Sequence, residues 1–254
     1  MNSRLDVVLW SKDQSITFER VFSEMKKIVY DVECMLSMYH PEAKVYQLNN
    51  DSFKTPVKVS GTLFTLIEQC IEFYHKTNGY FNIGYKASGS IGDSLVDQLI
   101  LDKEQQTVGY GSGEVQLDFG GIGKGIAIDR VAALLKHEEI ENAFVSFGGS
   151  SILTRGRHPY GEYWPLALED GRNTNLKLND AAVSISGFHE KENKEHVTDP
   201  KSGELNHKLK LVEVQMSCPV KAEVLSTALL VAPEREHQQI INNFNPELCI
   251  RIPL

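Results

Sequence analysis

Apolar residues recur at helical spacing in several stretches of this chain. Between Phe18 and Leu36 they occupy every third or fourth position, which predicts an amphipathic helix over about residues 17–38. A second stretch of this kind follows Ser60, a residue type that caps helices, and it stops at the turn residues 77–79. Further helices are expected after a glycine-rich turn up to about residue 137, over about 220–232 and over about 234–243.

Short apolar runs bounded by turn residues predict strands. Such runs lie at residues 5–9, 98–101, 106–110, 143–147, 163–169, 181–186, 209–217 and 248–253. Residues 42–58 are expected to be irregular or briefly extended. Helices and strands that mix without strict alternation favour an α+β (mixed α/β) fold, which we expect to form one compact domain over residues 1–254.

The segment from Leu117 to Asp129 is the most unusual part of the chain. A short apolar run ends at Asp118, and glycines then stand at 120, 121, 123 and 125 with Lys124 among them. This order predicts a strand, a tight turn and a helix N-terminus, where free amides and a lysine suit phosphate. The spacing fits neither the P-loop nor the Rossmann fingerprint, so the segment alone is equally consistent with a turn that binds nothing.

Two further segments carry polar residues in patterns that could form part of a binding or catalytic site. Glu223 and Thr227 are four residues apart in a predicted helix, so they share a face and together offer oxygen ligands for Mg²⁺. Residues 196–203, His-Val-Thr-Asp-Pro-Lys-Ser-Gly, join a histidine to a run that is typical of turns. Taken alone, the first pattern is usually a solvated helix face and the second a hairpin.

Composition argues against some classes of function. Asp and Glu outnumber Lys and Arg by 34 to 26, a net charge of −8, which disfavours broad nucleic-acid binding. The four cysteines form no C-x-x-C pair, which favours reduced, buried thiols. No apolar run reaches the length of a membrane span, and residues 1–20 show no signal peptide. We therefore expect a cytoplasmic protein if Met1 is the natural start, and a periplasmic or lipid-anchored one if an upstream signal was removed.

The order of these segments resembles the ApbE family, the FAD:protein FMN transferases. The resemblance extends over nearly the whole chain and rests on short motifs in a fixed order. From the N-terminus they are Met1-Asn2-Ser3, Leu36-Ser37-Met38-Tyr39, Leu48-Asn49, Thr77 to Asn82, Asp118 to Asp129, Ser146 to Ser150, Ser186-Gly187, His196 to Gly203 and Glu223 to Ala228. No single motif is decisive, but their common order argues strongly against chance.

The resemblance implies a fold of the ApbE (T-fold-like) type and a Mg²⁺-dependent enzyme that transfers FMN from FAD to a protein. The acceptor is a Ser or Thr hydroxyl in a short flavinylation motif of another protein, and AMP leaves. The positions that contact FAD in the family correspond to Met1, Tyr39, Tyr80, Phe81, Asn82, Asp118, Lys124 and His196. The resemblance assigns catalytic roles to His196 and Lys124, and metal binding to Gly121, Glu223 and Thr227.

This chain departs from the family pattern at some of these positions. Glu223 stands where the family usually has Asp, and Asn78 and Asn82 also replace Asp. The extra methylene of Glu223 moves a ligand oxygen by roughly an ångström, and Mg²⁺ tolerates poor octahedral geometry badly. If Glu223 is simply a longer ligand, Glu223→Asp should preserve or raise Mg²⁺-dependent turnover.

The sequence leaves three other interpretations open. Water could replace the acceptor hydroxyl, which gives a FAD pyrophosphatase that releases FMN and AMP. The departures at Glu223 and Asn82 also suit a non-catalytic protein that binds or delivers FAD without a metal. Metal dependence of FAD cleavage would separate the two enzymes from the binding protein. An unrelated globular protein is disfavoured by the order of the motifs.

Overall fold

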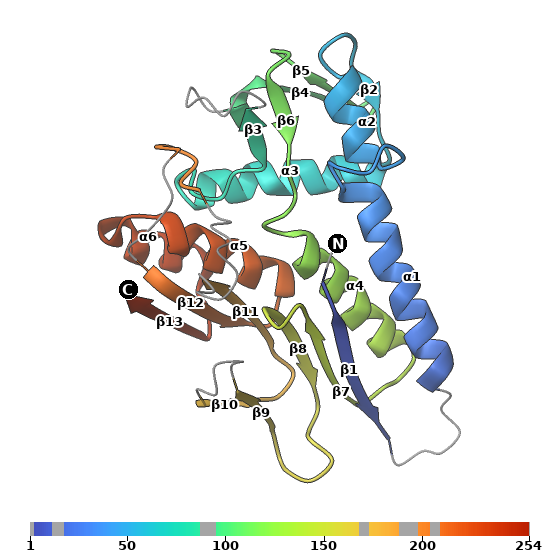
Figure 1. The fold of residues 1–254 in the computed structure, drawn as a ribbon, viewed down its shortest axis with the longest axis vertical. Coiled ribbons are helices and arrows are strands. Elements are labelled where there is room, and N and C mark those ends of the chain that lie inside the picture. The colour runs from blue at the N-terminus through green and yellow to red at the C-terminus, as the bar shows by residue number, and fades with distance from the viewer. Residues whose placement is uncertain are drawn as a thin grey trace.

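An antiparallel six-stranded sheet forms the base of the molecule, in the order β1-β7-β8-β11-β12-β13 (Figure 1). The computed structural model describes residues 3–11, 18–86, 95–167, 173–187, 198–203 and 209–253. The strands of this sheet are β1 (Leu5–Trp10), β7 (Asn142–Phe147), β8 (Ser151–Arg155), β11 (Ala182–Gly187), β12 (Leu209–Met216) and β13 (Leu248–Pro253). The sheet therefore joins the first strand of the chain to strands from its second half.

Helices cover one face of this sheet. The two that lie directly on it are α4 (Gly123–His137) and α5 (Pro219–Val231), with α1 (Phe18–Leu36) packed on α4 and α6 (Glu234–Phe244) on α5 (Figure 1). Because α5 is enclosed by strands and helices, it is apolar on almost every side. In the described ranges, no helix is both long and apolar enough to cross a membrane.

The opposite face of the sheet is covered by a hairpin. Its strands are β9 (Trp164–Ala167) and β10 (Asn173–Leu178). Trp164 packs there on Ile152 and Val183, which alternate along β8 and β11 with residues that face the helices. Strands β8 and β11 are thus buried on both faces near this hairpin.

A second group of elements lies beyond the helical layer. It comprises α2 (Lys44–Asp51), α3 (Gly61–Lys76), a short 3₁₀ helix (Leu95–Gln98) and two small sheets, β2-β5-β4 and β3-β6. Their strands are β2 (Val57–Lys58), β3 (Gly84–Lys86), β4 (Leu99–Asp102), β5 (Thr107–Tyr110) and β6 (Val115–Leu117). The glycine turn leaves β6 and enters α4, so it connects the two groups (Figure 1).

The helical periods predicted the long helices and the mixed α/β fold class correctly. Ser60 caps α3 by accepting the amide hydrogen of Leu63 at 3.3 Å. The predicted stop after α3 is a left-handed turn, with φ of 52° at Asn78 and 82° at Gly79. Both ends of this helix therefore follow from local residue chemistry.

The prediction of irregular structure over 42–58 was wrong, because α2 lies within this range. Its two buried residues, Val45 and Leu48, make a period too short to recognise in the sequence. The helix is fixed by tertiary contacts, since the Asn49 side chain accepts the amide hydrogen of Leu117 at 2.8 Å and donates to the carbonyl of Leu117 at 3.0 Å. Strands β8 and β10 were not predicted either.

Candidate active site

Most backbone donors of the glycine turn are already engaged. Asp118 Oδ1 accepts the amide hydrogen of Gly120 at 2.7 Å. The carbonyl of Phe119 accepts the amide hydrogens of Ile122 and Gly123. Within the described residues, the amides of Gly121 and Lys124 donate to no protein acceptor. These two amides lie at the N-terminus of α4, where the helix dipole favours an anion. The glycine turn thus offers two free donors rather than a full cradle.

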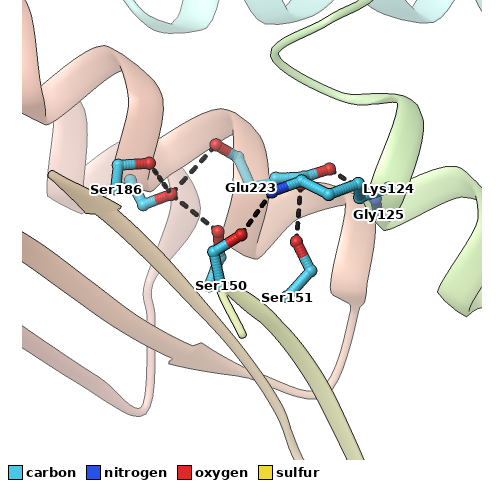
Figure 2. Close-up of polar contacts among 8 residues, drawn as sticks. Lys124, Gly125, Ser150, Ser151, Ser186 and Glu223 are labelled. Carbon is cyan, nitrogen blue, oxygen red and sulfur yellow. Dashed lines mark hydrogen bonds and ion pairs between the residues drawn. The ribbon is translucent and has the colours of Figure 1, made fainter. Parts of the chain in front are cut away.

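The Glu223 carboxylate of α5 is directed into the first turn of α4 (Figure 2). One of its oxygens accepts the amide hydrogen of Gly125, and the other accepts the Ser151 hydroxyl hydrogen at 2.7 Å. A Cβ atom on residue 125 would lie 2.7 Å from the nearer Glu223 oxygen, so only glycine leaves room for this contact. Glu223 therefore caps α4 from another helix. The residue at the N-cap position, Ile122, has no side-chain acceptor for this role.

Lys124 completes the surroundings of this carboxylate. Its ammonium donates to Ser150 Oγ and lies 3.8 Å from Glu223 Oε1. Burial raises the pKa of Glu223, while the Lys124 charge and the two hydrogen bonds act in the opposite direction. Because all three neighbours are donors, the ionised carboxylate satisfies them best. The Lys124 side chain is 26% exposed, so part of it lies at the surface.

Three serine hydroxyls hold the turn of α5 that carries Glu223 (Figure 2). Ser226 donates to the carbonyl of Glu223 at 3.1 Å, and its oxygen lies 2.9 Å from both Ser184 Oγ and Ser186 Oγ of β11. A hydroxyl has one hydrogen and two lone pairs, so Ser226 is fully satisfied when both β11 serines donate to it. The network ties α5 to the sheet in one register.

Two of the three predicted metal ligands, Gly121 and Thr227, lie side by side. A Cβ atom on Gly121 would lie 3.5 Å from Thr227 Cγ2 and 3.9 Å from Thr227 Oγ1. Neutral oxygens of this kind fit Mg²⁺, which usually completes its octahedron with water and substrate phosphates. The Glu223 carboxylate is one turn away but is engaged by protein donors. Its assignment as a metal ligand stays a prediction.

The described residues contain no cluster of three or more His, Cys, Asp or Glu side chains that could hold a metal ion. A cation at this site would therefore need hydroxyl, backbone or phosphate oxygens in addition to any single carboxylate. Such a site binds metal weakly in the absence of the phosphate ligand.

The structure separates the predicted flavin-contacting residues into exposed and buried ones. Tyr39 is 79% exposed beyond the end of α1, and Asp118 lies at the entrance of the glycine turn. By contrast, Tyr80 and Phe81 are buried, and Asn82 Oδ1 accepts the amide hydrogen of Gly84 at 2.7 Å. The contact of all these residues with FAD stays a prediction. Tyr80 and Phe81 also contribute to the packing of the fold.

Tyr80 joins three segments that are distant in sequence. Its hydroxyl donates to Glu236 of α6 at 3.1 Å, and the Lys201 ammonium lies 4.0 Å from the centre of its ring. These contacts place residues 198–203 against the turn after α3. The predicted site residues Met1 and His196 lie outside the described residues.

Sequence patterns gave no role to Ser150 and Ser151, which the structure places at the centre of the site. They follow Gly148 and Gly149, whose φ angles of 63° and 66° form the tight turn between β7 and β8. The Gly-Gly pair signals the turn, but the sequence holds no sign that the next two hydroxyls meet residues 124 and 223.

The geometry can now be compared with known proteins. The ApbE family model matches residues 1–251. The chain belongs to the ApbE family. Among its relatives, the FAD:protein FMN transferase of Haemophilus influenzae is 26% identical over 290 residues, which cover 96% of this chain and 83% of the relative. The FAD:protein FMN transferase of Chlamydia trachomatis is 26% identical over 242 residues, covering 84% of this chain and 76% of the relative.

Solved structures agree with this ApbE assignment at the level of the fold. The flavin transferase ApbE from Vibrio cholerae superimposes with a TM-score of 0.83 at 19% identity, covering 99% of this chain and 90% of that one. The ApbE protein from Thermotoga maritima gives a TM-score of 0.79 at 19% identity and covers 98% and 96%. The predicted family and mixed α/β fold class are therefore confirmed.

Proposed function

We propose that this ApbE chain is an FAD:protein FMN transferase. The observation that carries the proposal is the Lys124 ammonium beside two free amides at the N-terminus of α4, in a chain whose relatives bear this name. An ammonium and helix N-terminal amides together bind a phosphate or pyrophosphate. FAD contains a pyrophosphate, and its cleavage is the reaction that the name describes.

The transfer exchanges one phosphorus–oxygen bond for another. The oxygen of a Ser or Thr hydroxyl in an acceptor protein attacks the phosphorus on the riboflavin side of FAD. The bond from that phosphorus to the bridging oxygen breaks, AMP leaves with the electron pair, and the hydroxyl proton passes to a base. His196 is the predicted base or phosphate contact. The acceptor's sequence motif is not encoded in this chain.

The residues of this chain bind and orient the pyrophosphate. The free amides of Gly121 and Lys124 lie at the N-terminus of α4, and the Lys124 ammonium lies beside Ser150 and Glu223. These are the donors that we assign to the pyrophosphate, on which negative charge increases during the reaction. Thr227 and the backbone of Gly121 are the groups that would hold Mg²⁺, with phosphate oxygens and water. When bound, the cation neutralises phosphate charge and favours in-line attack.

Replacing Thr227 with valine should weaken the Mg²⁺ dependence selectively. Valine keeps the shape but lacks the hydroxyl, so we expect the Mg²⁺ concentration for half-maximal FAD cleavage to rise roughly tenfold. FAD affinity in EDTA should stay unchanged. A Mg²⁺ titration of turnover measures the effect, and Thr227→Ser serves as the control because it keeps the oxygen. An unchanged titration for the valine variant would remove Thr227 from the metal site.

The function is tested by incubating the purified protein with FAD, Mg²⁺ and a library of short peptides that each contain one threonine. We expect AMP to be released and one peptide class to gain the mass of FMN, as read by chromatography and mass spectrometry. Release of FMN and AMP with or without peptide would instead identify a FAD pyrophosphatase. FAD binding without cleavage under every metal condition would indicate a flavin-binding protein.

A further inference from the structure

We propose that Glu223 is a positioning residue that fixes Lys124 and the start of α4 for phosphate binding, rather than a metal ligand. We call its contacts with Gly125, Ser151 and Lys124 the Glu223 bridge. The inference rests on the proposed function, because it assigns Lys124 to the pyrophosphate of FAD. It also makes claims about the protein without FAD or metal, and these can be tested separately.

Both oxygens of the Glu223 carboxylate are already engaged by protein donors. Glu223 is only 4% exposed, and an ion at this depth is stable only when charged or polar partners replace the lost water. The protein supplies an amide from α4, a hydroxyl from β8 and an ammonium. A cation would have to compete with these donors in a buried site, and if it displaced them the Gly125 amide and the Ser151 hydroxyl would be left buried and unpaired.

The length of the Glu223 side chain also fits the bridge. Glu223 reaches from α5 to the backbone of Gly125, and the missing Cβ there gives its oxygen the space it occupies. Aspartate is shorter by one methylene, roughly 1.5 Å, which is enough to break a hydrogen bond from the same helix position. Glu223, which stands where the family usually has Asp, therefore makes a contact with Gly125 that the shorter acid could not make.

The Glu223 bridge also determines where the Lys124 charge lies. The ammonium is held between Ser150 Oγ and Glu223 Oε1 instead of moving freely in solvent. The carboxylate itself is held by the α5 turn that Ser226 ties to β11 (Figure 2). A lysine fixed in advance loses less conformational freedom when it binds a ligand. Glu223 thus acts on FAD through Lys124, without touching it.

The two assignments predict opposite orders for two variants. In the bridge, Glu223→Gln keeps the length and one acceptor, so it should retain more function than Glu223→Asp. For a metal ligand, Glu223→Asp keeps the charge and should retain more than Glu223→Gln. The quantities to measure are FAD affinity in EDTA by flavin fluorescence, Mg²⁺ affinity by calorimetry, and the thermal midpoint in EDTA.

We expect Glu223→Asp to lower FAD affinity in EDTA by about tenfold, the loss of one charge-assisted hydrogen bond, and to lower the thermal midpoint. Glu223→Gln should lie between this variant and the original chain, and Mg²⁺ affinity should change by less than about twofold in both, since no ligand is lost. Glu138→Asp is the matched control, because its carboxylate pairs with Arg20 just beyond the far end of α4. It should change none of these values.

The proposal is overturned if Glu223→Asp binds FAD in EDTA as tightly as the original chain, or if Glu223→Gln loses Mg²⁺ affinity tenfold or more. Failure of the proposed function looks different: the original chain would then not cleave FAD with Mg²⁺ present. Should the original chain bind no FAD at all, the thermal midpoints in EDTA still decide, because only the bridge predicts that Glu223→Asp lowers the midpoint more than Glu223→Gln does.

Discussion

Lys124→Ala is expected to weaken FAD binding about 10- to 100-fold, because one charge-assisted contact to the pyrophosphate is lost. The Lys124 side chain is 26% exposed, so it remains partly accessible to a ligand at the N-terminus of α4. The substitution also leaves the buried Glu223 without its only cationic partner among the described residues. We therefore expect the thermal midpoint to fall as well.

Fluorescence titration with FAD at low and moderate salt measures this effect. The original chain should lose affinity as salt increases, and the alanine variant should show a flatter dependence. Lys136→Ala is a suitable control, since Lys136 lies in the last turn of the same helix and far from the turn. Equal affinity of the Lys124 variant and the original chain would exclude the assigned contact.

Glu213→Gln is expected to stabilise the protein at neutral and alkaline pH by about 2 kcal/mol. Glu213 is 1% exposed on β12, between Ile185 of β11 and Ile250 of β13 in register, and its Oε1 has no hydrogen-bond partner in the described part of the chain. Burial raises the pKa of Glu213 to about 7. Glutamine stays neutral at every pH, so it avoids the cost of a buried charge.

The sign of this effect follows from the order of the two pKa values. Below about pH 4.5, glutamate is protonated in both the folded and the unfolded chain, and the two proteins should be equally stable. Between about pH 4.5 and 7 the unfolded chain ionises first, so the free energy of unfolding of the original chain falls as pH rises. Urea unfolding at pH 4.5 and pH 8 measures the difference.

The exposed Glu247, which accepts a hydrogen bond from Gln215 at 2.9 Å, provides a control for the loss of one negative charge. Glu247→Gln should leave the pH dependence of unfolding unchanged. A Glu213 variant that is no more stable than the original chain at pH 8 would show that the carboxyl finds a partner or water when it ionises.

Sequence reasoning succeeded where local chemistry decides the structure. The cap at Ser60 and the left-handed stop at Asn78 and Gly79 depend only on neighbouring residues, and both were predicted. The pairing of Gly121 with Thr227 followed from the order of family motifs. α2 was missed because its helical state depends on contacts of Asn49 with a strand nearly 70 residues away.

The contacts of the site could not be predicted for the same reason. Nothing in the sequence indicates that Glu223 turns towards Gly125, because this direction is set by how α5 packs on the sheet. The burial of Tyr80 and Phe81 is likewise a result of packing between α3 and α6. Motif order predicts which residues belong to the site, and only the fold shows which atoms meet.

The large sequence separation of the Glu223 contacts also affects the order in which the parts of the protein fold. Gly125 and Glu223 are 98 residues apart, and Ser151 and Glu223 are 72 apart. Contacts over such separations form late, after the cost of closing long loops has been met. During synthesis, Lys124 and the glycine turn emerge well before the carboxylate that holds them. Tight flavin binding should therefore be confined to chains in which α5 has docked, which makes FAD a probe for the final step of folding.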